Sequence, residues 1–564
     1  MIKTMKKILF YLAFGFIFTF SACTDDFDEI NENPTALTAN DVSAKFFVTS
    51  TQQQFFGPNR YPYWRGELIH ASRFSGHTAF GYKSNWWSDG LGYTHSGGYT
   101  GAVYDYMASY NSTLSSYTNF VKPGGTLENE QYYAIALIMK GLYYQKYADT
   151  FGAAPYTEAS DPDIVTPKLD SVQTIYEGVI AELDEAIGII GSNSTTGAGP
   201  ALLGENDLFF NGDMQKWKQL ANSLKLKMAL RGHLGNGADY SAHVSSALSS
   251  GILANDNALM SRDTEISQWT SAVYGDIWHN FYGGGNWHLG SKLVDHLRNN
   301  NDPRLAEYAM PITGGTFTLQ RASSGSNSSL FEKHSDFLVN HLIASGADVT
   351  DSGVTGDTRT VTVAAGAYVG QPVRMNGKIK PHLHRQFFSE PAPWVVNAKN
   401  SGKPIFPQIV MTAGESHFLA AQAAVLGIGT DANGHYQTGL RHAMKLWNVA
   451  DADIEKFIAN EAMATLSGTS EENLEKIATQ RWIAYFTASF EAWAVVRDTG
   501  YPKLPGVDSN NLDQDMYEIG DLNGHYPQRM RYGSGAYNKN GDNVRAAVSV
   551  QGADVQATKL FWAK

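Results

Sequence analysis

The stretch ENEQYYAIALIMKGLYYQKYADTF, residues 128–151, decides the fold of this 564-residue chain. Its apolar and aromatic residues recur at three- and four-residue spacing, as in Tyr132, Ala136, Met139, Tyr143 and Tyr147. This spacing places them on one face of an α-helix. Residues 99–121 carry the same pattern, and Pro123, Gly124 and Gly125 separate the two segments with residues that interrupt helices. The sequence therefore predicts a helical hairpin.

Further helices of this kind follow along the chain. They are expected at residues 171–190 and 213–231, at 417–426 and 435–448, and, as one long final helix, at 471–497. Asp213 stands where an N-cap residue is needed. Recurring hairpins bury their apolar faces against their neighbours, as in tetratricopeptide-like stacks. The sequence therefore predicts a mainly α-helical fold with helical repeats at about 99–231 and 415–497.

Two loop-rich insertions interrupt this helical scaffold. Residues 312–372 are rich in Gly, Ser and Thr, and alternating stretches such as Thr360 to Val363 indicate short strands. Residues 76–101 are similarly rich in glycine and lie before the first repeat. Long irregular loops in a compact protein are usually functional, so we expect the ligand site in such segments.

The N-terminus has the pattern of a lipoprotein export signal. Three lysines, an apolar run and two small residues precede the single cysteine: Lys3, Lys6, Lys7, Ile8 to Phe20, Ser21, Ala22 and Cys23. We expect residues 1–22 to be a cleaved signal peptide and Cys23 to carry acyl chains such as palmitate. Residues 23–40 would then be a flexible tether, and 41–564 a single domain. The alternative is an ordinary cleaved signal followed by an incidental thiol.

Length and charge limit the classes of partner. The apolar run is shorter than the roughly 20 residues that a membrane-spanning helix needs, and no later run reaches that length, so the expected membrane contact is the lipid on Cys23. The formal net charge is -12, and removing the three lysines of residues 1–22 makes it -15. Nucleic acids and anionic surfaces bind basic proteins, so we expect no nucleic-acid partner.

Several short strings, taken together, carry a family resemblance. They occur in this order: Cys23, Phe27, Asp28, Glu29, Ile30, Asn31, Asn33 and Pro34; Tyr147, Asp149, Phe151, Gly152, Pro155, Tyr156 and Glu158; Asp213, Trp217, Ala221 to Leu226 and Arg231; Asp302 to Leu305; Tyr368, Gly370 and Pro372; Glu415 and Phe418 to Ala420; Gln480, Trp482, Glu491, Trp493, Arg497 and Gly500 to Pro502; Tyr526, Pro527 and Arg529; and Lys559, Leu560, Trp562 and Lys564. The series resembles the SusD/RagB-like nutrient-binding lipoproteins of Bacteroidetes outer membranes.

This resemblance implies a fold, a location and a partner. The family fold is mostly helical, with tetratricopeptide-like repeats around a loop-rich region. The acidic run after Cys23 resembles a surface-export signal, which implies an outer-membrane lipoprotein facing the cell exterior. The implied partner is a TonB-dependent, SusC-like outer-membrane transporter. Most of the matching residues are expected to belong to the framework.

The first candidate ligand-binding residues lie between residues 80 and 99. Sugars need an aromatic platform for their C–H faces and planar polar groups for their hydroxyls. This segment offers both kinds of side chain, in Tyr82, Asn85, Trp86, Trp87 and Asp89. If the chain is extended at Trp86 and Trp87, their side chains point to opposite faces, so at least one is expected to be exposed. The alternative is that both tryptophans anchor the loop.

A second aromatic cluster lies around residues 269–287. Tyr274, Trp278 and Tyr282 are four residues apart, a helix-face spacing that favours a core role. Asn286 and Trp287 follow three glycines and are the ligand candidates of this cluster.

Enzymatic motifs are weak in this sequence. Gly414, Glu415, Ser416, His417 and Phe418 begin like a nucleophile elbow but lack its closing glycine and fall at a predicted helix start. His382 and His384 are two residues apart, a spacing that rarely makes a metal site. The sequence has no phosphate loop. We therefore expect neither catalysis nor a metal or other cofactor.

The leading hypothesis is a surface lipoprotein that captures an oligosaccharide and delivers it to the transporter. One alternative is capture of a peptide, as the RagB-like branch of the family allows. Another is a helical-repeat scaffold that assembles surface complexes without binding a nutrient. A surface hydrolase is the alternative that the motifs support least.

Overall fold

The structure, a computed structural model, describes most of the chain after residue 42. The described residues are 43–56, 61–79, 93, 95, 97–161, 163–233, 235–262, 287–396, 405–504, 513–517, 519, 522 and 525–564. Residues 44–564 form one compact unit. The predicted signal peptide, the predicted lipidation at Cys23 and the tether to residue 40 lie outside the described residues.

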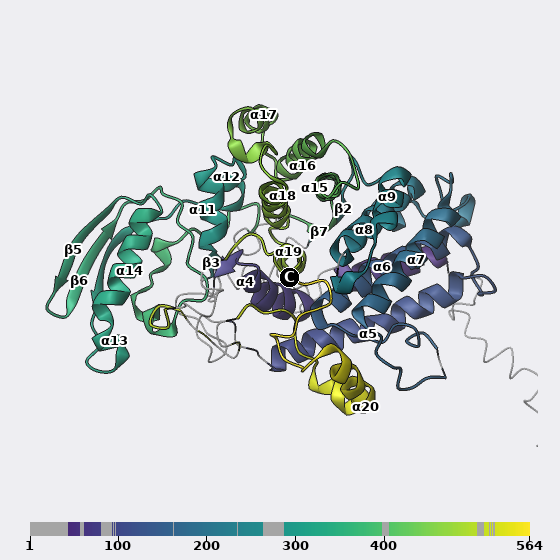
Figure 1. Cartoon of the computed structure of the whole chain (residues 1–564), viewed down its shortest axis with the longest axis horizontal. Helices are drawn as coiled ribbons and strands as arrows, with labels where there is room; N and C mark the ends of the chain where they lie inside the picture. The colour runs from purple at the N-terminus through teal and green to yellow at the C-terminus, as the bar shows by residue number, and fades with distance from the viewer. Residues whose placement is uncertain are drawn as a thin grey trace, which may run out of the picture. The chain divides into compact units, whose positions relative to one another are not determined.

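The first set of repeats is helical, as the sequence predicts. It consists of α5 (Gly97–Val121), α6 (Glu130–Phe151), α7 (Val172–Ile190), α8 (Met214–Gly232) and α9 (Ser241–Ser250). Helix α6 packs against α5, α7 and α8, and α8 packs against α9. Figure 1 shows these helices stacked side by side in blue and teal. The stack confirms the repeat-type fold expected from residues 128–151.

Polar caps fix where three of these helices begin. The Asp213 carboxylate accepts hydrogen bonds from the backbone N–H groups of Gln215 and Lys216 at 2.9 and 3.2 Å, as its position predicts. Asn129 and Ser171 cap α6 and α7 in the same way. Each cap satisfies N–H groups that have no partner within the helix.

The second set consists of α15 (Ala413–Val425), α16 (Ala432–Leu446), α17 (Asp451–Asn460), α18 (Ser470–Ala484) and α19 (Ser489–Thr499). Helix α15 packs against α16, α18 and α8, so α8 joins the two sets. The prediction of one long helix over 471–497 is wrong, because the chain turns at residues 485–488. Thr487 there has a left-handed backbone (φ 73°), and the Glu67 carboxylate accepts the N–H of Ser489 at the start of α19.

The insertion at 312–372 contains the expected strands and an unexpected helix. Strands β4 (Gly315–Gln320), β6 (Thr358–Val363) and β5 (Val349–Thr355) form an antiparallel sheet in that order. Helix α14 (Phe331–Ala344) packs against β5. Its buried residues recur at helical spacing and share a hydrophobic cluster with Val361 and Val363 of β6. Figure 1 shows the sheet and α14 side by side.

The remaining elements are short or lie outside the predicted segments. The helices are α3 (Ala44–Phe56), the π-helix η1 (Tyr61–Ala71), α4 (Ser72–Phe74), α11 (Ser291–Asn299), α12 (Arg304–Tyr308), α13 (Ser326–Ser329) and α20 (Ser534–Gln551). The strands are β1 (Thr78–Ala79), β2 (Ala258–Met260), β3 (His288–Leu289) and β7 (Gln408–Met411). None of the helices that the structure describes is long and apolar enough to cross a membrane.

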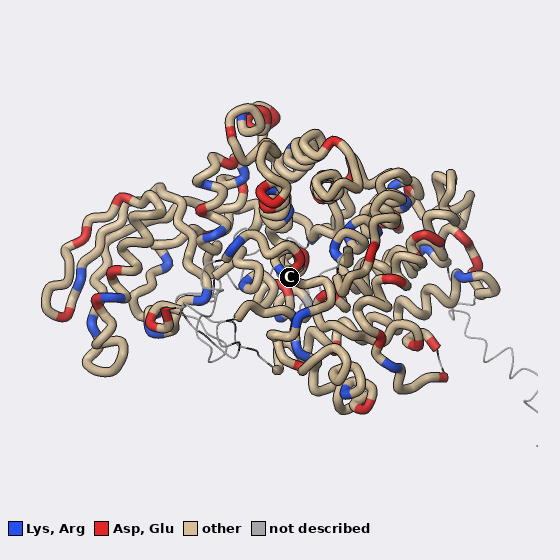
Figure 2. Tube along the Cα trace, viewed as in Figure 1, with Lys and Arg blue, Asp and Glu red and all other residues tan. Residues whose placement is uncertain are grey.

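Charged residues of both signs alternate along the described chain. Figure 2 shows Lys and Arg interspersed with Asp and Glu on most helices rather than gathered on one of them.

Candidate functional site

Most of the predicted ligand-binding residues lie outside the described part of the chain. These are Tyr82, Asn85, Trp86, Trp87, Asp89 and Asn286, together with the predicted helix face of Tyr274, Trp278 and Tyr282. Their role therefore stays a prediction. The structure does describe residues that border these segments in sequence.

The two predicted ligand segments join the fold at one small sheet. Strands β1 and β3 are antiparallel, with Ala79 paired with His288 and Thr78 paired with Leu289. The last described residue before the first segment, Ala79, therefore lies beside His288, close in sequence to the end of the second. At the other end of the second segment, Met260 of β2 pairs with Gln408 of β7. Both aromatic segments are thus anchored by backbone hydrogen bonds between strands that are distant in sequence.

Trp287 has a structural role in this fold. Its side chain is 0% exposed and belongs to the hydrophobic cluster that also holds Tyr63, Leu68 and Met375. Its position directly before β3 places the indole inside this cluster. This burial favours packing in the core, and the ligand contact expected of Trp287 stays a prediction.

The far border of the first segment is an aromatic residue in the core. Tyr93 is buried, and its ring contacts Phe74 and Tyr526 with centroid separations of 5.7 and 6.2 Å. The Arg374 guanidinium lies 5.1 Å from the centre of the Tyr93 ring. Burial raises the pKa of Tyr93 to about 12, so its hydroxyl stays protonated at neutral pH. Ala79 and Tyr93 thus fix both borders of residues 80–92.

A cavity of about 730 Å³ lies on the other side of Tyr526. Its polar and charged lining residues come from α19, the chain after α19, and the C-terminal segment: Arg497, Lys503, His525, Tyr526, Gln528, Lys559 and Lys564. Val496, Pro502 and Leu504 supply apolar wall. Sequence reasoning missed this cavity because its cations are up to 67 positions apart, from Arg497 to Lys564.

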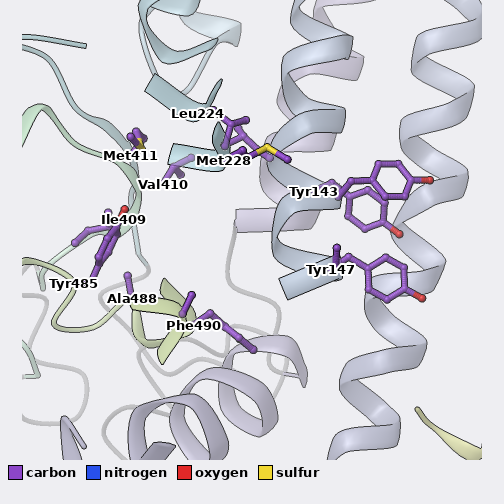
Figure 3. Close-up of a cluster of buried hydrophobic side chains, with 14 of the residues drawn as sticks. Tyr143, Tyr147, Leu224, Met228, Ile409, Val410, Met411, Tyr485, Ala488 and Phe490 are labelled. Atoms are coloured by element: carbon purple, nitrogen blue, oxygen red, sulfur yellow. The ribbon is translucent and has the colours of Figure 1, made fainter. Parts of the chain in front are cut away.

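A buried ionic network holds the helices behind this cavity. Figure 3 shows Tyr143 and Tyr147 of α6, Leu224 and Met228 of α8, strand β7 and Phe490 of α19 around one hydrophobic cluster. Helices of the two sets also place charged side chains in the interior, all of them buried except Glu491, whose side chain is 15% exposed: Asp149 of α6, Lys227 and Arg231 of α8, Glu415 of α15, Arg481 of α18 and Glu491 of α19.

Arg231 is the centre of this network. Its guanidinium contacts the Asp149 carboxylate and lies 2.8 Å from the Glu491 carboxylate. Lys227 lies 3.6 Å from the same Glu491 carboxylate, and Gln145 donates a hydrogen bond to it at 2.7 Å. Burial alone would raise the pKa of Glu491, but Lys227 and Arg231 outweigh it and hold that pKa below its ordinary value. Glu491 is therefore ionised at neutral pH.

The network also positions the cavity lining. Arg497 donates from Nη1 to the backbone oxygens of Asp149 at 2.7 Å and of Gln528 at 2.8 Å. Its guanidinium lies 3.7 Å from the centre of the Trp493 ring. Burial lowers the pKa of Arg497 to about 10, so it remains a cation at neutral pH. One wall of the cavity is therefore attached directly to the helix stack.

Residues 414–418, whose sequence begins like a nucleophile elbow, have a structural role. Ser416 is buried in the first turns of α15, and its hydroxyl donates to the backbone oxygen of Thr412 at 3.0 Å, next to the Ser223 hydroxyl. His417 is held by the backbone oxygen of Ala254 through its Nε2 at 3.0 Å. This histidine cannot activate Ser416 in that orientation.

The paired histidines do not share a site in this structure. His382 is buried against the Phe331 ring, and His384 packs on the Phe317 ring with a centroid separation of 4.4 Å. Among the described residues, no group of three or more His, Cys, Asp or Glu side chains is arranged to hold a metal ion.

Comparison with known proteins gives the family. The family model described as "Starch-binding associating with outer membrane", SusD-like, matches residues 78–532. Similar solved structures include a chitin-binding protein with 24% identity, a TM-score of 0.69 and coverage of 92% of this chain and 99% of that chain. They also include a SusD homologue from Bacteroides uniformis with 23% identity, a TM-score of 0.67 and coverage of 93% and 100%.

A third structure, a SusD-like protein from Bacteroides thetaiotaomicron, has 22% identity, a TM-score of 0.66 and coverage of 92% of this chain and 98% of its own. No curated protein matches this chain. The structural likenesses, all below 25% identity, show the shared fold, while the family model spans most of the sequence. The resemblance seen in the sequence is thereby confirmed, and the chain belongs to the SusD-like family of Bacteroidetes.

Proposed function

We propose that this protein is a surface lipoprotein that captures an oligosaccharide and delivers it to a TonB-dependent, SusC-like outer-membrane transporter. The family match over residues 78–532 carries the proposal, because its description joins glycan binding with the outer membrane. A solved structure of the same fold is a chitin-binding protein. The proposal extends this type of binding to the present chain.

The proposed ligand contacts lie in the two anchored segments. Trp86, Trp87 and Tyr82 provide rings for sugar C–H faces, and Asn85, Asp89 and Asn286 provide polar groups for hydroxyls. The pairing of Ala79 with His288 supports this assignment, because it brings the borders of the two segments together.

The proposed membrane contact is through acyl chains on Cys23 at the outer face of the outer membrane. Two or three acyl chains give stable anchoring, since each buried CH₂ contributes about 0.8 kcal/mol. A tether beside a transporter raises the local ligand concentration, so modest affinity is sufficient for delivery. Metabolic labelling with a clickable fatty acid tests the anchor: wild-type protein should be labelled and Cys23→Ala should not.

We propose binding without catalysis. The hydrogen bonds that hold Ser416 and His417 away from a nucleophile–base geometry support this view. Release of shorter products from a labelled glycan incubated with the purified protein would contradict it.

The central experiment measures binding of the protein lacking residues 1–23 to a panel of oligosaccharides and peptides. Residues 44–564 form one compact unit, so this truncation keeps the described fold intact. Starch- and chitin-derived oligosaccharides belong in the panel because the family is described as starch-binding and one similar structure is that of a chitin-binding protein. Binding to peptides and to no glycan would replace the proposal with the peptide alternative, and binding to neither would favour a scaffold.

We expect Trp86→Ala and Trp87→Ala to weaken binding of the best glycan. Loss of one stacked ring costs about 0.5–1.5 kcal/mol beyond lost contact area, so the expected effect is about three- to tenfold in Kd. Phe46→Ala is the matched control, because Phe46 is an aromatic residue of α3 that is 56% exposed and remote in sequence from both segments. Unchanged affinity in both tryptophan variants would remove residues 80–92 from the site.

A further inference from the structure

The cavity beside Tyr526 is notable because the described side chains that line it include several cations and no carboxylate. Arg497, Lys503, Lys559 and Lys564 line it together with His525, and no Asp or Glu is among the described lining residues. The chain as a whole has a formal net charge of -12. A concave, basic surface on an acidic protein concentrates positive potential where an anionic group could enter.

The three lysines of the cavity lack ion-pair partners among the described residues. Lys503, Lys559 and Lys564 have no described carboxylate within 4.0 Å. The lysines of the helix stack differ: Lys140 pairs with Glu182, and Lys216 lies 2.8 Å from Asp256.

The acid nearest to this lining in sequence offsets part of its charge. Asp498, next to Arg497, is buried and interacts electrostatically with Lys564, but it is not part of the cavity lining. Burial raises the pKa of Asp498 to about 6, so this carboxyl is still mostly ionised at neutral pH. Binding of an anionic group would therefore depend mainly on Lys503 and Lys559, since no described carboxylate lies within 4.0 Å of either.

Size and position connect the cavity to the proposed glycan site. A volume of about 730 Å³ falls within the range of small-molecule ligand pockets and far exceeds the need of a single inorganic anion. The lining residue Tyr526 donates from its hydroxyl to the backbone oxygen of Phe74 at 2.5 Å, and its ring contacts Tyr93. The lining residue Leu504 lies against Gly76. Two lining residues of the cavity therefore contact Phe74 and Gly76, which precede β1, and Tyr93, which follows residues 80–92.

We propose that this cavity binds the anionic groups of an acidic oligosaccharide, either uronic-acid carboxylates or sulfate esters. The lysines contact the anionic groups. This inference rests on the proposed function and specifies its ligand class as acidic rather than neutral glycan.

The experiment uses the full chain in detergent and isothermal titration calorimetry. One pair of ligands is an oligogalacturonate and its carboxyl-reduced, neutral form of the same length; the other is a sulfated oligosaccharide and its desulfated form. We expect at least one acidic ligand to bind about tenfold or more tightly than its neutral partner, with an advantage that shrinks as NaCl rises, because exposed charges are screened. The pair that shows the difference identifies carboxylate or sulfate.

Substitutions of the cavity lysines test whether the tighter binding of the acidic ligand arises in this cavity. Lys503→Gln and Lys559→Gln should each weaken binding of the acidic ligand about two- to fivefold, as expected for exposed charge pairs, and leave binding of the neutral form unchanged. Lys539→Gln is the matched control, because Lys539 is an exposed lysine of α20 outside the cavity lining. The lysine variants should keep the circular dichroism spectrum of the wild type.

Two outcomes overturn the inference, and they differ from failure of the proposed function. Equal affinity for acidic and neutral forms, with sensitivity to Trp86→Ala retained, refutes the acidic ligand class and leaves glycan capture standing. Equal effects of Lys503→Gln, Lys559→Gln and Lys539→Gln refute the cavity as the site. Absence of binding to every glycan, acidic or neutral, refutes the proposed function itself.

Discussion

Replacing Arg231 by methionine tests whether the buried ionic network holds the helix stack together. Arg231 is 1% exposed and contacts carboxylates on two other helices, Asp149 of α6 and Glu491 of α19. Arg231→Met keeps a long side chain but removes the cation. Both carboxylates would then remain buried with fewer partners.

The expected loss in the free energy of unfolding follows from the hydrogen-bond and charge partners that Asp149 and Glu491 keep in Arg231→Met. Asp149 keeps hydrogen bonds from the Tyr176 hydroxyl at 2.6 Å and from the Gln145 amide at 2.5 Å. Glu491 keeps Lys227 at 3.6 Å and the same amide at 2.7 Å. Removing one partner of a buried ion pair typically costs about 3–5 kcal/mol, and these remaining bonds place the expected loss near 3 kcal/mol.

Urea unfolding followed by tryptophan fluorescence and far-ultraviolet circular dichroism measures this loss. Arg545→Met is the matched control, because Arg545 pairs with Asp542 on the surface of α20 with its side chain 64% exposed. Exposed pairs contribute about 0–1 kcal/mol, so the control should unfold almost like the wild type. A decrease below about 1 kcal/mol for Arg231→Met, or one equal to the control, would show that the network does not stabilise the stack.

Two further predictions concern acid sensitivity and helix packing. Burial lowers the pKa of His77 to about 3, whereas the unfolded chain takes up this proton near pH 6.5, so the free energy of unfolding should fall as pH drops from 6.5 to 3. His77→Gln should make the slope of stability against pH shallower by up to about 1.4 kcal/mol per unit in urea unfolding series, and an unchanged slope would contradict this assignment. In α7, a Cβ at Gly178 would lie 2.5 Å from the Tyr156 ring, while a Cβ at Gly188 would meet nothing within 4 Å. Gly178→Ala should therefore destabilise the protein by about 1–3 kcal/mol and Gly188→Ala should stabilise it by up to about 1 kcal/mol, and the same sign for both would refute the packing argument.

The helix pairs were predictable because local signals determine them. Apolar residues at three- and four-residue spacing marked α6 and α7, and Asp213 marked the start of α8. These signals act within a few residues of each other, so a sequence displays them directly.

The break between α18 and α19 was not predictable from local pattern. Residues 485–488 contain neither glycine nor proline, and the turn is stabilised by Glu67, more than 400 positions away. Helix α14 is a different case, since its spacing from Phe331 to Leu342 is helical. The glycine- and serine-rich flanks obscured that signal.

The candidate site was only partly predictable. Trp287 follows three glycines, as a loop residue would, yet its ring is buried, because burial depends on what packs around a residue and not on its neighbours in sequence. Glu491, Arg231 and Asp149 were recognisable as family residues, but their pairing arises only when three helices meet. The cavity lysines were likewise visible in the sequence without any sign that they share one space.

The contact between Arg231 and Glu491 spans 260 positions and has a consequence for how the chain matures. In an ordinary repeat array each new hairpin is stabilised by the previous one, so the structure can grow as the ribosome extends it. Here the first hairpins contain Arg231, and Glu491, one of its two carboxylate partners, is synthesised long after the other, Asp149. A nascent chain that stops before Glu491 should therefore stay loosely assembled and sensitive to proteases, and completion of α19 should act as the closing step of biogenesis.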